Sequence, residues 1–348
     1  MKTSPPMELS VALANECASR GFHRIDAQSY ALDGIRSSTE DLQPGQFALA
    51  NDSRFNQAFF SQPLTAYAVG WRDAAIDAEL EFFAPQTPVS RYFQYATSVN
   101  AEEFYSELYD DLRAIGGDFK RVEYKSTKVT ARTENRGLTL RVDLDEVGAT
   151  PDWERNAVAK LLRRLKRNSL RRAIALLSAA AVNTAKTWDT TAGKDPDQDV
   201  ASELIVARNA SGVPDNRVGY GDTAWSKRML AHRAQASAGG FGSANMTPDE
   251  VASWLGVEQV MRSKARYQSS SSAKSEVVSN LVLMFNAASG QSTEDPSHIK
   301  RFVTPSGSGG DVDVYSQQVG AKLYDITVSF YELTKITFTG GIRKFTVS

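Results

Sequence analysis

Carboxylates at alternating positions are the first residues in this chain that could do chemistry. Asp195, Asp197 and Asp199 occupy positions 1, 3 and 5 of the segment DPDQDVASELIV, which is the spacing of oxygen ligands in a calcium-binding loop. Such a loop also needs a glycine at position 6 and a glutamate at position 12, and these positions hold Val200 and Val206. Acidic residues also favour the first turn of a helix. The segment therefore predicts the start of a helix rather than a calcium site.

Other side chains that could act as nucleophiles, bases or ligands are few and scattered. His23, His232 and His298 form no HExxH or HxH pattern, and Cys17 is the only cysteine. The sequence has no GxSxG, CxxC or GxxxxGK[ST] motif. We therefore expect no catalytic residue, no metal site and no cofactor, and we expect that the protein is not an enzyme.

The composition bounds the class of protein. The 348 residues include 40 Lys and Arg against 41 Asp and Glu, so the net charge is −1 and no global positive charge attracts nucleic acid or anionic lipid. No apolar run reaches the length of about 20 residues that spans a bilayer, and the segment MKTSPPMELS lacks the apolar centre of a secretory signal. We expect two or three domains, no membrane partner and a cytoplasm-like environment.

A long basic helix must position most of the clustered charge. Residues 151–183 have a helical pattern with one apolar stripe that includes Leu161 and Leu165. The opposite face is basic and carries Lys160, Arg163, Arg164, Arg167 and Arg171, flanked by Arg155, Lys166 and Arg172. This face could bind phosphates through unpaired guanidinium groups, or it could pair with acidic neighbours such as those in residues 102–111.

A charged β-ribbon is expected before this helix. Leu138, Leu140 and Val142 alternate with polar residues and follow a β-rich segment at 122–131, so residues 134–137 are predicted to be the turn of a long hairpin. Its outward positions are basic: Lys120, Arg121, Lys125, Lys128, Arg132, Arg136 and Arg141. Because isolated two-stranded ribbons are marginally stable in water, we expect this one to lie against something outside its own domain.

The remaining chain divides into an arm, an α/β region and a β tail. Residues 1–60 show no sustained period and are interpreted as an extended arm. The glycine-rich segments 238–245 and 305–311 lack the lysine of a phosphate-binding loop and are interpreted as flexible loops. Gly340 and Gly341 suit a two-residue hairpin turn in the tail. Helices are predicted at 199–210, 222–232 and 247–255, and strands near 216–220, 257–268 and 278–288.

In this order, the parts resemble the major capsid proteins of tailed bacteriophages with the Hong Kong 97 fold. RVEYKSTKVTARTENRGLTLRVDLDEV and the basic helix after it resemble the extended loop and spine helix of that family. VPDNRVGYGDTAWSKRMLAH and MTPDEVASWLGVEQVMRSKARYQ resemble a strand–helix and a helix–strand unit of its axial domain. The resemblance covers about residues 83–348. It implies an α+β fold with an N-terminal arm and the start of a peripheral domain (1–82), an extended β-hairpin loop (83–147), a peripheral-domain spine helix (148–185), an α/β axial domain (186–304) and a returning β tail in the peripheral domain (305–348).

The same resemblance implies a function. The expected protein is a major capsid (head) protein that self-assembles into hexamers and pentamers of an icosahedral shell enclosing packaged double-stranded DNA. Its extended loop would overlap a neighbouring subunit, and its basic helix face would contact the DNA non-specifically. Further partners would be scaffolding and portal proteins and, in some cases, decoration proteins. The location would be the virion capsid, assembled in the host cytoplasm.

Three alternatives stay open at this point. A shell of the same fold could be an encapsulin-like cellular nanocompartment that encloses protein cargo. A DNA-binding adaptor would depend on the basic face at 160–171 alone, and its isolated subunit would bind DNA with strong salt dependence. An enzyme with an unrecognised site in residues 186–304 would need Asp189, Asp195 and His232 to converge in one pocket.

Overall fold

The computed structural model describes residues 59–97, 112, 113, 115, 117, 119, 127–148, 150–235, 238–288, 297–306 and 310–348. All of them belong to one unit, which spans residues 57–348. The predicted arm at 1–60 lies outside the described residues, except for its last two.

Two helices begin at the capping residues that the sequence predicts. Asp195 begins a helix by accepting a hydrogen bond from the backbone N–H of Gln198, and Thr247 begins another in a reciprocal capping box with Glu250. Gly256 ends the latter in the left-handed conformation, with φ of 67°. The helices in the described residues are α3 (Gln62–Gly70), α4 (Ala74–Phe83), α5 (Leu144–Val147), α6 (Trp153–Ala180), α7 (Pro196–Ser211), α8 (Asp222–Ala234), α9 (Ala238–Ala244) and α10 (Pro248–Leu255).

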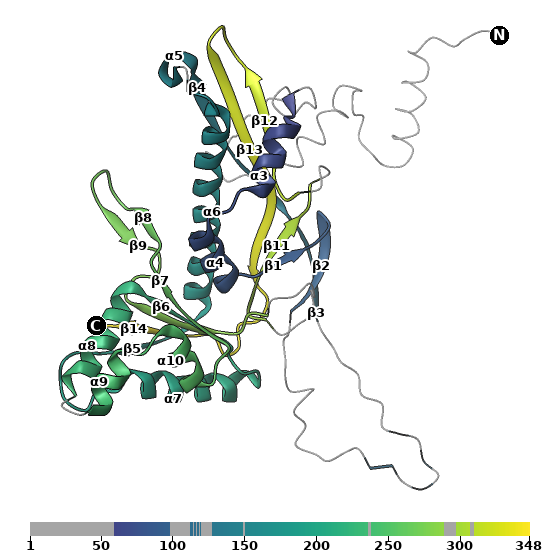
Figure 1. Cartoon of the computed structure of the whole chain (residues 1–348). Coiled ribbons are helices and arrows are strands. Elements are labelled where there is room, and N and C mark those ends of the chain that lie inside the picture. The colour runs from purple at the N-terminus through teal and green to yellow at the C-terminus, as the bar shows by residue number, and fades with distance from the viewer. Residues whose placement is uncertain are drawn as a thin grey trace. The chain divides into compact units, whose positions relative to one another are not determined.

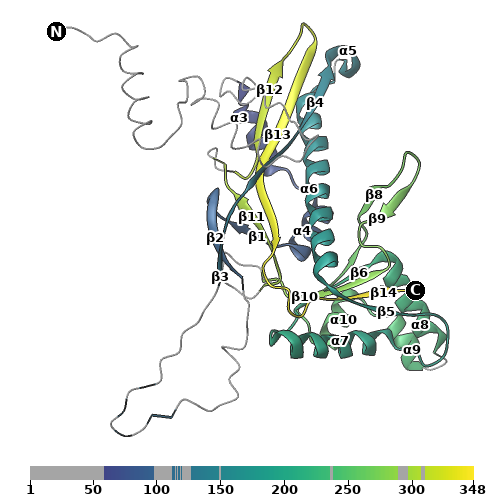
Figure 2. The same ribbon diagram turned by 180° about the vertical axis from the view of Figure 1, so that it is seen from behind.

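One large sheet is built around the long strand β13. It consists of β1 (Gln86–Pro88), β4 (Glu134–Asp143), β11 (Ile299–Thr304), β12 (Asp313–Gln318) and β13 (Leu323–Ile336). Strand β13 pairs antiparallel with β4, β11 and β12, and β1 pairs parallel with β11. Helix α6 packs along this sheet (Figures 1 and 2), with Leu161 and Leu165 in one buried cluster with Ile326 and Val328.

A second large sheet forms the α/β part. It consists of β5 (Val182–Lys186), β6 (Arg217–Gly221), β7 (Gln259–Ser263), β10 (Leu281–Phe285) and β14 (Arg343–Val347), in the order β5-β14-β10-β6-β7. Successive residues of β10 bury on opposite faces, as a strand requires. Val282 and Met284 pack with α7, α8 and α10, whereas Leu283 and Phe285 pack with α4 and the last turns of α6.

Two short ribbons complete the described fold. Strand β2 (Tyr92–Thr97) pairs antiparallel with β3 (Thr127–Arg132), and β8 (Arg266–Gln268) pairs antiparallel with β9 (Lys274–Glu276). In both views β8 and β9 project beside α6 (Figures 1 and 2). In the part of the chain that the structure describes, no helix is long and apolar enough to cross a lipid bilayer.

The predicted long hairpin with a turn at 134–137 is wrong. Residues 134–137 lie inside β4, which pairs with β13, and β3 pairs with β2 instead of β4. The alternating residues explain the outcome, because Leu138, Leu140 and Val142 contact the cluster around α6, which a two-stranded ribbon cannot offer them. The ribbon that flanks residues 98–126 is therefore β2 with β3.

The β tail also differs from the prediction. Gly340 and Gly341 do not form a two-residue hairpin turn, because they join β13 of one sheet to β14 of the other. The predicted tail 305–348 contributes strands to both sheets. Strand β11 lies within the predicted axial segment 186–304 but joins the β13 sheet, and β5 begins within the predicted spine-helix segment 148–185 but pairs with β14.

The glycine-rich segment 238–245, interpreted above as a flexible loop, contains helix α9. Its glycines permit a close approach to the end of α8. A Cβ atom at Gly240 would lie 2.6 Å from the carbonyl oxygen of His232. Packing against α8 therefore outweighs the low helix propensity of glycine here.

Candidate functional site

The basic face of α6 is exposed along its whole length. Lys160, Arg163, Arg164, Arg167 and Arg171 all have exposed side chains. The apolar stripe opposite is buried against the β13 sheet and α4, as predicted. The face therefore presents its charges to solvent.

Part of this charge is paired within the subunit. Arg163 Nε lies 3.3 Å from a carboxylate oxygen of Asp73, and Lys166 Nζ lies 2.6 Å from one of Asp77. Both cations also lie over the Trp71 ring. The acids that pair with Arg163 and Lys166 therefore lie before and within α4, whereas the predicted partners at 102–111 lie outside the described residues.

The remaining cations form what we call the basic stripe, made of Lys160, Arg164, Arg167 and Arg171. None of these four has an ion-pair partner among the residues that the structure describes. At about 1.5 Å per helical residue they extend over about 16 Å. A row of solvated cations with this density can neutralise several phosphates of a nucleic-acid backbone.

The ribbon β8–β9 is fixed next to the basic stripe. The Arg171 guanidinium lies 4.1 Å from the centroid of the Tyr267 ring in β8. At the base of the ribbon, Arg262 and Arg266 each donate to the Asp222 carboxylate at 2.6 Å. Partial burial alone would raise the pKa of Asp222, but the bonds from these two arginines outweigh burial and hold the pKa below its ordinary value.

The predicted intersubunit loop is only partly described. Lys120, Arg121 and Lys125 lie outside the described residues, and Lys128 is exposed on β3. Arg132, also on β3, is half-buried.

Arg136 is not part of a free loop, because it lies half-buried on β4 and forms an ion pair with Glu134. Burial lowers its pKa, with the charge of Arg172 as the next cause.

The ribbon β2–β3 anchors the intervening segment 98–126. Its register runs from Tyr92 opposite Arg132 to Thr97 opposite Thr127. The Phe93 and Tyr95 rings pack on Phe302 of β11, with centroid distances of 4.6 and 5.4 Å. The ribbon on either side of residues 98–126 therefore packs against the β13 sheet.

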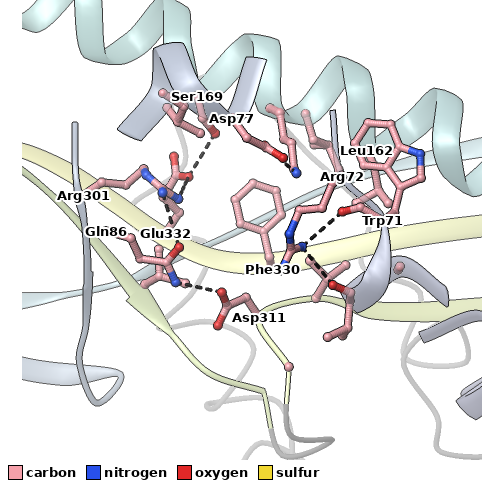
Figure 3. A pocket seen from close by; sticks show the side chains of 18 of the residues that line it. Trp71, Arg72, Asp77, Gln86, Leu162, Ser169, Arg301, Asp311, Phe330 and Glu332 are labelled. Atoms are coloured by element: carbon pink, nitrogen blue, oxygen red, sulfur yellow. Dashed lines mark hydrogen bonds and ion pairs between the residues drawn. The ribbon is translucent and has the colours of Figure 1, made fainter. Parts of the chain in front are cut away.

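A cavity of about 470 Å³ lies between α3, α4, α6 and the β13 sheet (Figure 3). At its wall the buried Glu332 accepts hydrogen bonds from Ser169 at 3.0 Å and Arg172 at 2.8 Å, and Arg301 lies 3.8 Å from it. The charges around Glu332 compensate one another, which is typical of a structural network. In the sequence, this network is indicated only by an acidic residue, Glu332, among the apolar residues of FYELTK.

The carboxylates of the calcium-like segment have structural roles. Asp195 caps α7, Asp199 accepts hydrogen bonds from Lys186 and Trp188, and the buried Asp197 binds Arg228 through two bonds of 2.6 and 2.7 Å. The prediction of a helix start is confirmed. Within the described ranges, no group of three or more His, Cys, Asp or Glu residues could hold a metal ion.

The residues of the enzyme alternative each have another partner. Asp189 accepts from the backbone of Thr191, and Asp195 caps its helix. His232 Nε2 lies 3.1 Å from Asp197, in the buried pair with Arg228. Asp189, Asp195 and His232 therefore each contact a different partner.

Comparisons with known proteins complete the description. Neither protein-family models nor curated proteins match this sequence. Among solved structures, a phage-related protein from Bordetella bronchiseptica aligns with a TM-score of 0.60 and 18% identity, over 82% of this chain and 96% of that chain. The capsid structure of cyanophage P-SCSP1u aligns with a TM-score of 0.51 and 11% identity, over 80% of this chain and 89% of that chain.

At such identities these alignments compare folds. Both cover about four fifths of this chain. The chain therefore has the mixed α and β fold of the Hong Kong 97-like phage capsid proteins.

Proposed function

We propose that this chain is a major capsid protein, whose copies self-assemble into the hexamers and pentamers of an icosahedral shell. The observation that carries the proposal is the alignment with the cyanophage P-SCSP1u capsid structure over 80% of the chain. On this proposal the protein has a structural role, which is to pack with other copies into a shell. It catalyses no reaction and requires no cofactor.

The segment 98–126 supplies the contact with a neighbouring subunit on this proposal. Its described apolar residues Leu112, Ile115 and Phe119 are 92%, 106% and 73% exposed. Burying one such side chain contributes about 1.5–3 kcal/mol. A neighbouring copy that covers this segment therefore gains stability that the isolated subunit lacks.

The basic stripe faces the enclosed DNA on this proposal. Its cations have no ion-pair partners among the described residues, and phosphate contacts release counterions without requiring a base sequence. On the same proposal the partners of this chain are scaffolding and portal proteins and, in some cases, decoration proteins. The capsid assembles in the host cytoplasm and becomes part of the virion.

Electron microscopy and light scattering of the purified full chain test the assembly. The expected result is closed shells, tubes or discrete capsomers. A stable monomer of 38.1 kDa that stays monomeric when concentrated or mixed with a scaffold would contradict the proposal. The ratio of absorbance at 260 and 280 nm then separates shells that hold nucleic acid from shells that hold protein cargo.

A pair of loop variants sharpens this test. Because Thr97 lies opposite Thr127, a short turn can replace residues 98–126 without separating β2 from β3. This variant should fold but fail to assemble. A matched variant keeps the length and replaces the sequence by glycine and serine, so it separates the need for a long segment from the need for its side chains.

A further inference from the structure

A buried acid and a buried base meet where the chain crosses between the two large sheets. Asp215 lies in the connection from α7 to β6, and His298 lies directly before β11. Both side chains are fully buried, and Asp215 Oδ1 lies 3.6 Å from His298 Nδ1. This distance is too long for a hydrogen bond, so the two groups face each other without one.

The hydrogen bonds of His298 fix its protonation. The backbone N–H of Asn286 donates to His298 Nδ1 at 2.8 Å, so Nδ1 holds a lone pair and the proton of the neutral ring is on Nε2. The backbone N–H of His298 donates in return to the carbonyl oxygen of Asn286 at 2.8 Å. His298 therefore ties the end of β10 to the start of β11.

Asp215 has no comparable bonds. Neither carboxylate oxygen has a hydrogen-bond partner among the described residues. Burial raises the pKa of Asp215 to about 7, although the positive charges of Arg343 and Arg208 act in the opposite direction. Burial also lowers the pKa of His298 to about 4, against a smaller effect of the Gly340 backbone. At pH 5–6 both side chains are therefore neutral.

The charged groups around Asp215 belong to α7 and β14. Arg208 is on α7, and Arg343, which begins β14, lies 3.8 Å from Glu203 of α7. The connection between β13 and β14 also passes from one sheet to the other, and it packs beside His298. The Phe338 ring lies 5.4 Å from the His298 ring.

We propose that Asp215 and His298 form a proton-controlled latch between the two sheets, in which the neutral pair keeps the end of β10, the start of β11 and residues 337–342 packed together, and ionisation of Asp215 loosens them. An ionised Asp215 is a buried charge without a hydrogen-bond donor, opposite the lone pair of His298 Nδ1. It regains a partner by turning toward Arg343 or Arg208 or by reaching water. Each of these moves changes its position opposite His298, whose bonds with Asn286 join β10 to β11.

Hydrogen exchange measured by mass spectrometry on the unassembled full chain tests the latch. The peptides of interest cover residues 281–288, 297–304 and 337–343, and rates are corrected for the intrinsic pH dependence of exchange. If only Asp215 is exposed on opening, the opening constant should rise about tenfold per pH unit between pH 5 and pH 7 and level off above.

Two variants make the outcome specific. Asp215→Asn mimics the protonated acid and should give an opening constant that does not depend on pH. Asp189→Asn removes a carboxylate whose partner is the Thr191 backbone, and it should keep the wild-type dependence. Equal opening at pH 5 and pH 8 in the wild type, or the wild-type dependence in Asp215→Asn, would overturn the proposal.

A second measurement covers the case in which Asp215→Asn does not fold. The chain has only three histidines, so the imidazole Cε1–H resonances of the wild type can be followed by NMR. The His298 resonance should shift with an inflection near pH 7, where its neighbour ionises, while the ring itself stays neutral. A His298 ring that titrates at its ordinary pKa, or a resonance without that inflection, would sink the latch.

Discussion

Arg171 of α6 lies with its guanidinium 4.1 Å from the centre of the Tyr267 ring of β8, and this stack joins the long helix to the projecting ribbon β8–β9. The ribbon has only two strands of three residues each. Ribbons of this size are marginally stable alone. The stack and the Asp222 bonds at the ribbon base therefore determine its orientation.

Replacing Tyr267 by leucine should loosen the ribbon. An exposed cation–π contact contributes about 0.5–1 kcal/mol. Proteolysis within residues 269–273 should therefore become about two- to fivefold faster. Tyr92→Leu, at a tyrosine that is 65% exposed on β2, is the matched control and should leave that cleavage unchanged. Equal cleavage rates in the wild type and Tyr267→Leu would refute a role for the stack.

Replacing Arg164 and Arg167 together by glutamine should leave assembly intact and weaken retention of nucleic acid. Neither side chain has an ion-pair partner among the described residues, so the subunit loses no ion pair that the structure describes. The slope of log affinity for duplex DNA against log salt should fall by about 2. The control is Lys186→Gln with Lys322→Gln, which removes the same charge from cations paired with the partly exposed Asp199 and Asp145. An equal loss of DNA in both double variants would contradict a specific role of the basic stripe.

Replacing Asp197 by alanine should destabilise the α/β part by about 3–5 kcal/mol, because it leaves the fully buried Arg228 without its carboxylate. Urea unfolding monitored by tryptophan fluorescence measures the change. Asp145→Asn removes an ion pair with Lys322 whose side chains are 69% and 61% exposed, and it should cost less than about 1 kcal/mol. Similar losses for the two variants would mean that burial does not decide the strength of these pairs.

The Asp215–His298 pair should contribute almost no pH dependence to global stability between pH 4 and 6.5. The folded Asp215 has a raised pKa of about 7, so its contribution falls as pH rises from 3.8 to 7. The folded His298 has a lowered pKa of about 4, so its contribution falls as pH drops from 6.5 to 4. In the shared window both the folded and the unfolded pair hold one proton, and the two effects cancel.

Single variants should reveal the hidden slopes. Asp215→Asn leaves the histidine effect, so stability should fall by up to about 1.4 kcal/mol per unit as pH drops from 6.5 to 4. His298→Asn leaves the aspartate effect, so stability should fall by a similar slope as pH rises from 4 to 7. Urea titrations of both variants relative to the wild type give the slopes. Slopes of equal sign in the two variants would contradict the assignment of the proton.

The elements that follow local rules could be predicted from the sequence. The capped helices α7 and α10 and the apolar stripe of α6 depend on residues within a few positions of one another. The pairing of β4 could not be predicted in this way, because its partner β13 is far away in sequence: Thr139 lies opposite Thr327. The β-rich segment 122–131 was predicted as the partner of β4 because the two segments are neighbours in the chain.

The candidate site was predictable in outline only. The exposure of Lys160, Arg164 and Arg167 follows from the helical period. The pairing of Arg163 with Asp73 depends on how α4 packs against α6, and the burial of Asp215 depends on two crossing segments that meet only in the folded chain. These relationships are tertiary, so a residue pattern does not contain them.

The position of β14 has a consequence for the timing of protein synthesis. This strand lies between β5 and β10 in its sheet, and about 160 residues separate β5 from β14 in the chain. At a translation rate of about 5–20 residues per second, β5 waits on the order of ten seconds for its neighbour. The α/β part cannot complete its sheet before residue 347 leaves the ribosome.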